Sequence, residues 1–166
     1  MKIKKIQNKP GFTLIEIIAV LFIVSLGLVG VLSLIIQNIQ GQNLNKNNII
    51  AYQLAQEGVE FVRKVRDTNW NNNDPVWDNY LAPGSYYMDY LDETPNLLTV
   101  DSQGDLYKDI DGFYVHGGGV TQTNFNRIIE ITSTSTYSIV IHSRVSWMDH
   151  KQNYEYDLAA TLFNWK

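Results

Sequence analysis

Apolar residues gather first in one long block near the start of the chain. Residues 12–36 contain a single charged side chain, Glu16, and residues 17–36 contain none. About 20 apolar residues in a helix span the ~30 Å hydrocarbon core of a bilayer. The block therefore predicts a membrane-spanning helix. The polar residues that follow it lack the small-residue cleavage pattern of a secretory signal, which favours a segment that the mature protein keeps.

The helical pattern continues beyond this block in an amphipathic form. Apolar residues between positions 51 and 65 recur at steps of three and four, the spacing of one helix face. The residues of this stripe are Ala51, Leu54, Ala55, Gly58, Val59, Phe61, Val62 and Val65. No proline occurs between Pro10 and Pro75. We therefore expect one helix from about Phe12 to about Arg66, whose second half needs a soluble partner.

The last third of the chain has the alternation that is typical of strands. Residues 68–119 are rich in turn signals, and a stretch this long in a compact domain is expected to contain short strands. Residues 125–132, 137–147 and 154–165 then alternate, with turns between them. They predict an antiparallel meander whose apolar face the stripe at 51–65 can cover. The expected fold class is α+β: a long N-terminal helix, transmembrane in its first half, with its second half packed on a C-terminal antiparallel sheet.

Charge is distributed unevenly along the chain. The net charge is -4, yet the first eleven residues hold four lysines and no acid. Positive charge before a membrane segment places the N-terminus in the cytoplasm and the remainder outside the cell membrane. The acidic remainder repels phosphate backbones, so general nucleic-acid binding is not expected. The absence of cysteine excludes a disulfide scaffold, a thiolate metal site and a cysteine nucleophile. The lysines are Lys2, Lys4, Lys5 and Lys9.

The junction between the basic segment and the apolar block has its own chemistry. Gly11 offers no side chain that would obstruct a peptidase, and Pro10 together with Gly11 discourages a helix there. Phe12 then begins the apolar run, and Glu16 lies inside it. A carboxylate within a membrane segment is costly and marks a functional candidate. The plain alternative is an interfacial carboxylate that reaches water near the cytoplasmic end.

Residues 1–40 strongly resemble the N-terminal cleavage and methylation segment of type IV prepilins and type II secretion pseudopilins. The resemblance implies that a prepilin peptidase cuts between Gly11 and Phe12 and then methylates the new amino group of Phe12. It also implies that Glu16 pairs with the positive N-terminus of a neighbouring subunit in a fibre. The implied partners are other pilin or pseudopilin subunits, the peptidase, and a platform protein with its cytoplasmic ATPase.

One feature departs from the pattern of this family. Many members have a proline further along the mature helix, where the helix locally melts in the fibre. This chain has Ser33 nearby and no proline, although Gly27, Gly30 and Gly41 weaken a helix by about 1 kcal/mol each relative to alanine. The departure favours a minor pilin or pseudopilin over a main shaft subunit.

Other candidate sites are weak. Four aspartates lie close together in the sequence, and oxygen-rich clusters of this kind suit calcium, which some pseudopilins bind near their sheet. The EF-hand spacing is not met, because Leu106 follows Asp105, so a solvated acidic loop is favoured and calcium is the alternative. His116 precedes a glycine run like a lipase oxyanion loop, but no G-x-S-x-G motif accompanies it. We expect no enzyme activity and no cofactor. The four aspartates are Asp101, Asp105, Asp109 and Asp111.

The sequence as a whole predicts a chain in four segments. Residues 1–11 form a basic leader, 12–36 the transmembrane and assembly half of the helix, and 37–66 its amphipathic half. Residues 67–166 form a globular domain of loops and antiparallel sheet. The expected function is that of a structural subunit of a type IV pilus or type II secretion-like pseudopilus. The alternative is a single-pass, membrane-anchored extracytoplasmic binding domain that does not polymerise.

Overall fold

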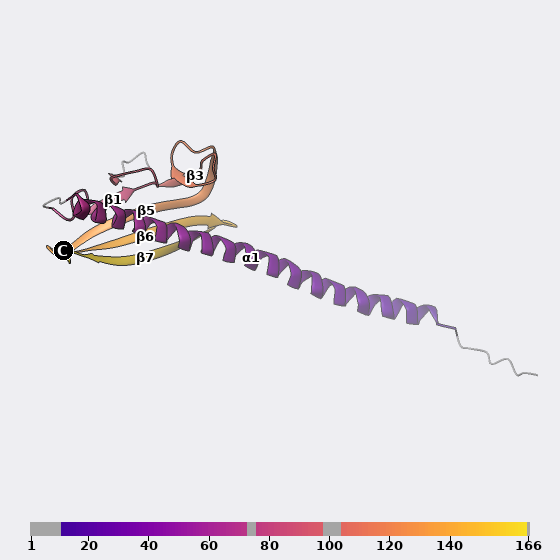
Figure 1. Cartoon of the computed structure of the whole chain (residues 1–166). Coiled ribbons are helices and arrows are strands. Elements are labelled where there is room, and N and C mark those ends of the chain that lie inside the picture. Colours follow the sequence, from indigo (N-terminus) through magenta and orange to yellow (C-terminus); the bar gives the residue numbers. More distant parts are fainter. Residues whose placement is uncertain (1–10, 73–75, 98–103, 166) are drawn as a thin grey trace, which may run out of the picture. The chain divides into compact units, whose positions relative to one another are not determined.

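The structure is a computed structural model that describes residues 11–72, 76–97 and 104–165. This part of the chain forms one α-helix and seven β-strands, labelled in order along the sequence (Figure 1). The elements are α1 (Leu14–Asn71), β1 (Gly84–Tyr87), β2 (Asn96–Leu97), β3 (Asp105–Lys108), β4 (Tyr114–His116), β5 (Thr121–Ser135), β6 (Ser138–Asp149) and β7 (Gln152–Phe163).

The chain divides into two compact units, residues 1–43 and 44–166. The first unit contains the N-terminal half of α1. The second unit contains the remainder of α1 and all the described strands. The α+β fold class expected from the sequence is confirmed, with the helix packing on the sheet within the second unit.

The long strand β5 organises the sheet of the second unit. One side of β5 pairs with β6 along almost its whole length, and its other side pairs with β1 and with β3. The strands β7, β2 and β4 then add to β6, β1 and β3 respectively. Every one of these pairings is antiparallel, so β5, β6 and β7 form the expected meander. The short strands β1 to β4 account for the turn-rich segment before it.

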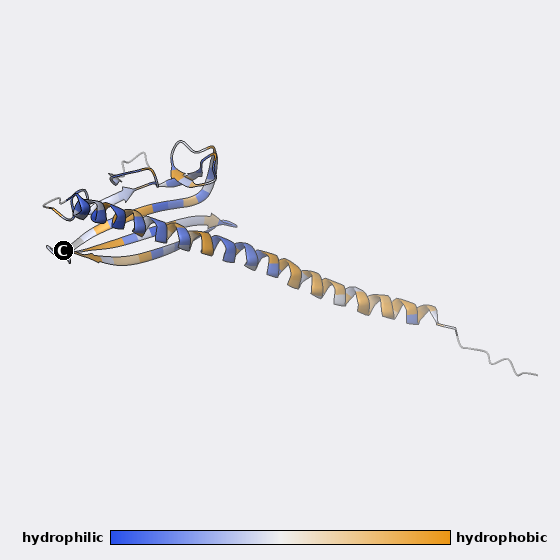
Figure 2. Ribbon diagram, in the orientation of Figure 1, coloured by the Kyte–Doolittle hydropathy of each residue, from blue (hydrophilic) through white to orange (hydrophobic). Residues whose placement is uncertain are grey.

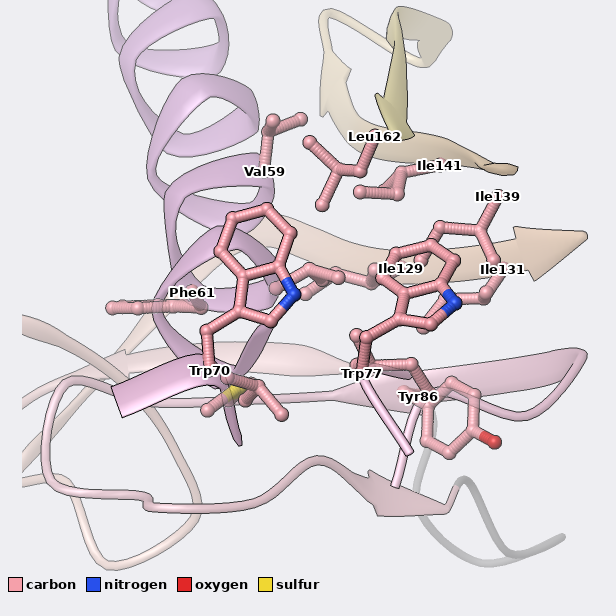
Figure 3. Close-up of a cluster of buried hydrophobic side chains, with 14 residues drawn as sticks. Val59, Phe61, Trp70, Trp77, Tyr86, Ile129, Ile131, Ile139, Ile141 and Leu162 are labelled. Carbon is pink, nitrogen blue, oxygen red and sulfur yellow. The ribbon is translucent and has the colours of Figure 1, made fainter. Parts of the chain in front are cut away.

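The apolar stripe of α1 is buried against this sheet, as its spacing predicts. All eight residues of the stripe are buried. Ala51, Leu54 and Ala55 pack with a cluster that includes Phe125 and Trp147. The later residues of the stripe pack with a larger cluster, in which Trp70 and Trp77 lie beside isoleucines of β5 and β6 (Figure 3).

The closest approach of α1 to the sheet occurs at Gly58. A Cβ atom at this position would collide with the Oγ atom of Ser143 on β6, and it would lie 3.4 Å from the Cδ atom of Arg127 on β5. Both Gly58 and Ser143 are buried. The glycine at position 58 therefore allows the close packing of the helix on the sheet. The sequence pattern alone does not distinguish this position from the other positions of the stripe.

The helix extends beyond the end expected near Arg66 and stops at Asn71. Its last turns are held by a contact within the helix and by tertiary contacts, in place of the apolar periodicity. The guanidinium of Arg66 lies 4.4 Å from the ring centroid of Trp70, and the Trp70 ring contacts Trp165. The side-chain amide of Asn69 donates to the carbonyl of Trp77 over 3.1 Å. These contacts stabilise an asparagine-rich end that propensity alone would not keep helical.

In the first unit, α1 runs without a break through Gly27, Gly30 and Gly41. A Cβ atom at any of these three positions would meet no atom within 4 Å. The glycines are therefore not required by packing within the described part of the chain. Figure 2 shows the apolar character of this half of the helix and the mixed character of the half that covers the sheet.

Candidate functional site

The start of α1 is built by a capping motif that immediately follows the expected cleavage site. Thr13 immediately precedes the helix, and the backbone N–H of Glu16 donates to the Thr13 hydroxyl over 3.3 Å. The carbonyl of Thr13 also accepts from the N–H of Ile17 over 3.2 Å. Thr13 is therefore the N-cap, and Glu16 is the third helical residue, the spacing of a Thr-x-x-Glu capping box.

The bond between Gly11 and Phe12 lies outside the helix. Neither residue has helical structure, and the Phe12 side chain is 81% exposed. A Cβ atom on Gly11 would meet no atom within 4 Å. An enzyme that binds an extended peptide could therefore approach this bond without unwinding α1. The leader lysines expected to precede it, at positions 2, 4, 5 and 9, lie outside the described residues.

Glu16 is exposed on the first turn of α1 and faces the same side as Phe12. The two side chains border a shallow hollow whose other lining residues are all apolar: Ile17, Val20 and Leu21. A carboxylate near a helix N-terminus is stabilised by the helix dipole. The arrangement places one acidic residue beside an apolar surface of the helix.

The remainder of this helix half presents apolar side chains on all sides. Within the described part of the chain, α1 is the only helix with a stretch long and apolar enough to cross a membrane, and none of that stretch is buried. Its surface suits lipid tails or the apolar faces of other helices. This apolar helix is consistent with membrane anchoring before assembly. Large exposed residues of this stretch include Leu21, Phe22, Ile23, Leu26, Val29, Leu32, Leu34 and Ile36.

The aspartates weighed as calcium ligands take part in local hydrogen bonds. Asp109 accepts from the backbone N–H groups of Asp111 and Phe113, each over 2.9 Å, and so closes the turn between β3 and β4. Asp105 accepts from the side-chain amide of Asn126 over 3.2 Å. The described residues contain no group of three or more side chains of His, Asp or Glu placed to hold a metal ion. Asp101 lies outside the described residues.

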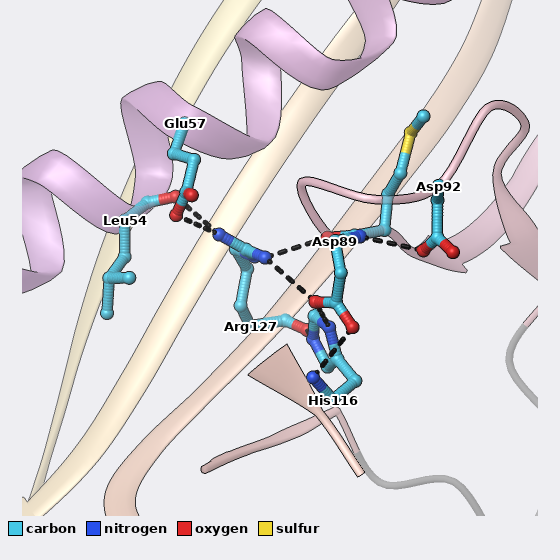
Figure 4. A network of polar contacts seen from close by, with 7 residues as sticks. Leu54, Glu57, Asp89, Asp92, His116 and Arg127 are labelled. Carbon is cyan, nitrogen blue, oxygen red and sulfur yellow. Dashed lines mark hydrogen bonds and ion pairs between the residues drawn. The ribbon is translucent and has the colours of Figure 1, made fainter. Parts of the chain in front are cut away.

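A buried polar network was not expected from the sequence. Arg127 on β5 is fully buried, and its guanidinium extends between α1 and the loop after β1 (Figure 4). One end of the guanidinium, Nη1, donates to the Glu57 carboxylate over 2.7 Å. The other end, Nη2, donates to the Met88 carbonyl over 2.7 Å and lies 3.6 Å from the Asp89 carboxylate. Burial lowers the pKa of Arg127, and the carboxylates of Glu57 and Asp89 oppose this shift.

His116 extends this network to β4. Its Nδ1 atom lies 2.7 Å from the Asp89 carboxylate, and its backbone N–H donates to the other Asp89 oxygen over 2.9 Å. Its Nε2 atom lies 3.2 Å from the backbone carbonyl of Arg127. The ring side chain is only 6% exposed. Both ring nitrogens therefore face oxygen atoms inside the protein. Through them, His116 links β4 to β5 and to the loop after β1.

The geometry of the network favours a structural role over a catalytic one. The Arg127 guanidinium has no exposed surface, so it cannot contact a substrate in this conformation. A pattern in the sequence could have pointed to it, because Phe125, Arg127, Ile129 and Ile131 share one face of an alternating strand. An arginine among inward-facing apolar positions requires an acid within reach of its guanidinium. Glu57, beside the apolar stripe of α1, is that partner.

Comparison with protein families matches residues 6–32 to the prokaryotic N-terminal methylation motif. No curated protein and no solved structure matches the chain. The matched segment includes Gly11, Phe12, Glu16 and the first turns of α1. Proteins of the pilin family are typically structural and non-enzymatic. The chain is therefore a pilin-like protein, which carries the N-terminal methylation motif of type IV pilins and pseudopilins on a long helix followed by a C-terminal antiparallel sheet.

Proposed function

We propose that this chain is a structural, non-enzymatic subunit of a type IV pilus or a type II secretion-like pseudopilus. The observation that carries the proposal is the coincidence of three features within the matched segment. Gly11 and Phe12 form an exposed, non-helical junction. Glu16 is the one charged residue among residues 12–36. The large apolar side chains of that segment are exposed. A cleavable leader, a single acid and an apolar helix are the parts that a helical fibre needs.

Processing would convert the junction into an assembly group. Hydrolysis of the Gly11–Phe12 amide adds water and leaves a carboxylate on Gly11 and an amine on Phe12. A methyl donor bound to the peptidase would then methylate that amine, which keeps its positive charge. Removal of the leader also removes the four lysines. Without this step, those lysines would crowd positive charge into the apolar centre of a fibre, where desolvation is costly.

The mature N-terminus and Glu16 are complementary across neighbouring subunits. Four residues along a helix correspond to about 6 Å of rise. If two apolar helices stagger by about that distance, the Glu16 carboxylate of one subunit meets the Phe12 amine of the next. A charge pair between packed apolar helices is screened far less than a pair in water. The pair would therefore set the axial register of the subunits.

The capping position of Glu16 provides a second, local reason for an acid there. A Glu or Gln at the third helical position can bond back to the N-cap residue, whereas only a charged Glu can neutralise an amine. Replacement by Gln therefore separates the two roles. If Glu16 acts only as a cap, Gln preserves function, and if it pairs with the amine, Gln does not.

The lysine-rich leader places the N-terminus in the cytoplasm, and the second unit lies outside the membrane before and after assembly. The partners are other pilin or pseudopilin subunits, a prepilin peptidase, and an assembly platform with its ATPase. Because the helix has no proline, we assign the chain to a minor pilin or pseudopilin rather than to the main shaft.

The location of the chain tests the proposal. Filaments are sheared from cells that express the tagged full chain, pelleted, and labelled with gold-conjugated antibody to the tag. We expect labelling along the filaments or at their tips, and its loss when Gly11→Arg blocks processing. Processed chain found in membranes alone, with unlabelled filaments of other subunits, would instead support a membrane-anchored binding domain that does not polymerise.

A further inference from the structure

The last strand, β7, has a long free edge. β7 pairs with β6 in an unbroken ladder from Ser138↔Phe163 to Asp149↔Gln152. Its other side pairs with no strand among the residues that the structure describes. Every second N–H and C=O group along this edge is therefore available to a further strand. The edge has no bulge, no proline and no inward-facing charge, the devices that usually protect an edge from pairing.

The core beneath β7 is incomplete on the side of this edge. The inward-facing side chains of β6, such as Ile141 and Val145, are buried. The corresponding side chains of β7, among them Tyr156, Leu158 and Ala160, are only half-buried. An added strand with apolar inward-facing residues would cover them. The outward-facing residues of β7 are exposed from Asn153 to Phe163.

We propose that the free edge of β7 binds an extended strand of a different polypeptide, whose side chains alternate between apolar and basic. Main-chain hydrogen bonds to an open edge select a strand as the occupant, and the side chains of alternate positions set its specificity. The apolar side chains of the added strand would pack on the half-buried face of β7. Its basic side chains would lie on the outward face.

The negative charge on the outward face of β7 favours basic side chains on the added strand. β7 carries Glu155 and Asp157 and no lysine or arginine. Asp157 already contacts His142 and Arg144 of the neighbouring strand β6. Glu155 lies opposite Ser146, which has no charge. A lysine or arginine opposite Glu155 on an added strand would therefore form a cross-strand pair of opposite charge.

The same acids disfavour pairing between two copies of β7. Glu155 and Asp157 occupy the middle of the strand. In any antiparallel register near the centre, the acids of the two copies lie opposite or diagonal to one another, because facing residues share a face of the sheet. A parallel pair in register places each acid opposite itself. The occupant is therefore a partner of different sequence. This binding needs neither cleavage at Gly11 nor charge on Glu16, so it does not rest on the proposed function.

Peptide binding to the full chain in detergent micelles tests the proposal. The probe is a fluorescent, end-capped peptide of alternating valine and lysine, and its binding is followed by fluorescence anisotropy. Two control peptides have glutamate in place of lysine, or methyl groups on all the central backbone nitrogens. The methyl groups keep the charge but remove the hydrogen-bond donors of both peptide edges. We expect saturable binding of the lysine peptide and binding at least about tenfold weaker for each control.

Three variants locate the binding on β7. Glu155→Lys should reverse the preference, so that the glutamate peptide binds more tightly than the lysine peptide. Because the chain has no cysteine, Ala159→Cys on β7 should form a disulfide with a cysteine-bearing lysine peptide when oxidised glutathione is added as the oxidant, whereas Met148→Cys, exposed on β6, should form little. Equal binding of the methylated peptide, an unchanged preference in Glu155→Lys, or equal cross-linking at both positions would each overturn the proposal. So would the absence of lysine-peptide binding.

Discussion

The guanidinium of Arg127 on β5 donates to the carboxylate of Glu57 on α1 over 2.7 Å, and Arg127 is fully buried. This one ion pair connects the sheet to the helix that covers it. A buried cation without a partner is strongly destabilising, whereas a partly exposed carboxylate can regain water. We therefore expect Arg127 and Glu57 to contribute unequally to the stability of the fold. The free energy of unfolding depends most on whether the Arg127 guanidinium has carboxylates beside it.

Replacing Glu57 by Gln tests this dependence. The change keeps the size of the side chain but leaves the buried guanidinium without its main countercharge. We expect the free energy of unfolding to fall by about 1–3 kcal/mol. Urea unfolding of the full chain in detergent, followed by the fluorescence of the buried Trp70, Trp77 and Trp147, measures the loss.

Three further variants complete this test: Glu60→Gln, Arg127→Met, and Arg127→Met combined with Glu57→Gln. Glu60→Gln alters an exposed ion pair with Arg63 on the same helix, and we expect a change within about 0.5 kcal/mol. Adding Arg127→Met to Glu57→Gln should cost less than the sum of the two single changes, by about 1 kcal/mol or more. Equal effects of Glu57→Gln and Glu60→Gln would show that the network contributes nothing beyond surface charge.

The contact between Gly58 and Ser143 makes a second prediction. Gly58→Ala would bring a methyl group against the Ser143 Oγ atom, and overpacking of this kind costs about 1–3 kcal/mol. The higher helix propensity of alanine offsets about 1 kcal/mol of that cost. The Ser143 hydroxyl has no hydrogen-bond partner within the described residues. Ser143→Ala should therefore rescue Gly58→Ala in the same urea measurement, and a double variant no more stable than Gly58→Ala would contradict the close approach.

The sequence predicted the parts of this fold that depend on periodicity. The stripe from Ala51 to Val65, the meander of β5 to β7, and the cover of one by the other all follow from the spacing of apolar residues. The expected end of the helix was early, because the last turns are held by the i,i+4 contact of Arg66 with Trp70 and by tertiary contacts of Asn69 and Trp70 rather than by an apolar pattern.

The alternation of β5 places Arg127 on its buried face, but it does not identify the residues that bind the guanidinium. The members of the network around Arg127 come from α1, β4, β5 and the loop after β1, so only the folded chain brings them together. His116 precedes a glycine run in the sequence, and its ring lies inside the protein beside Asp89. The motif around Gly11 and Glu16, in contrast, was recognisable from the sequence, because its residues follow one another along the chain.

The division of the chain at residues 43 and 44 predicts an independently folding domain. A chain that begins at Leu44 lacks the exposed apolar surface of the first unit but keeps the buried stripe of α1. We expect it to be soluble, folded and largely monomeric, by analytical ultracentrifugation and by a cooperative thermal melt. Val62→Asp should abolish that melt, because Val62 is 1% exposed and an unpaired charge would face the sheet. A melt unchanged by Val62→Asp would contradict the helix–sheet packing.

The proposed cleavage of the Gly11–Phe12 bond gives the mature chain a defined N-terminus. Mass spectrometry of the N-terminal peptide from membranes should find a chain that starts at N-methylated Phe12, since the Gly11–Phe12 bond is exposed and lies before the helix cap at Thr13. Gly11→Arg should leave the leader attached. An intact leader on the wild-type chain, or a cut beyond Ile36, would be incompatible with a processed pilin-like subunit.

The proposed assembly of subunits through the N-terminal helix depends on the charge of Glu16. Glu16→Gln keeps a capping side chain on the first turn and removes the charge, whereas Glu16→Val removes both. Neither change touches the Gly11–Phe12 bond, so both variants should be cleaved and remain in the membrane. Each should enter fibres poorly, because the amine of a neighbouring Phe12 is left without a countercharge among apolar helices.

The most direct measurement compares the amount of processed chain in membranes and in sheared filaments for wild type, Glu16→Gln and Glu16→Val. We expect equal amounts of processed chain in the membranes of all three, and at least about tenfold less of each variant in filaments, the ratio that about 1.4 kcal/mol of lost pairing produces. Incorporation of Glu16→Gln at the wild-type level would contradict assembly through a charge pair and leave Glu16 as a helix cap.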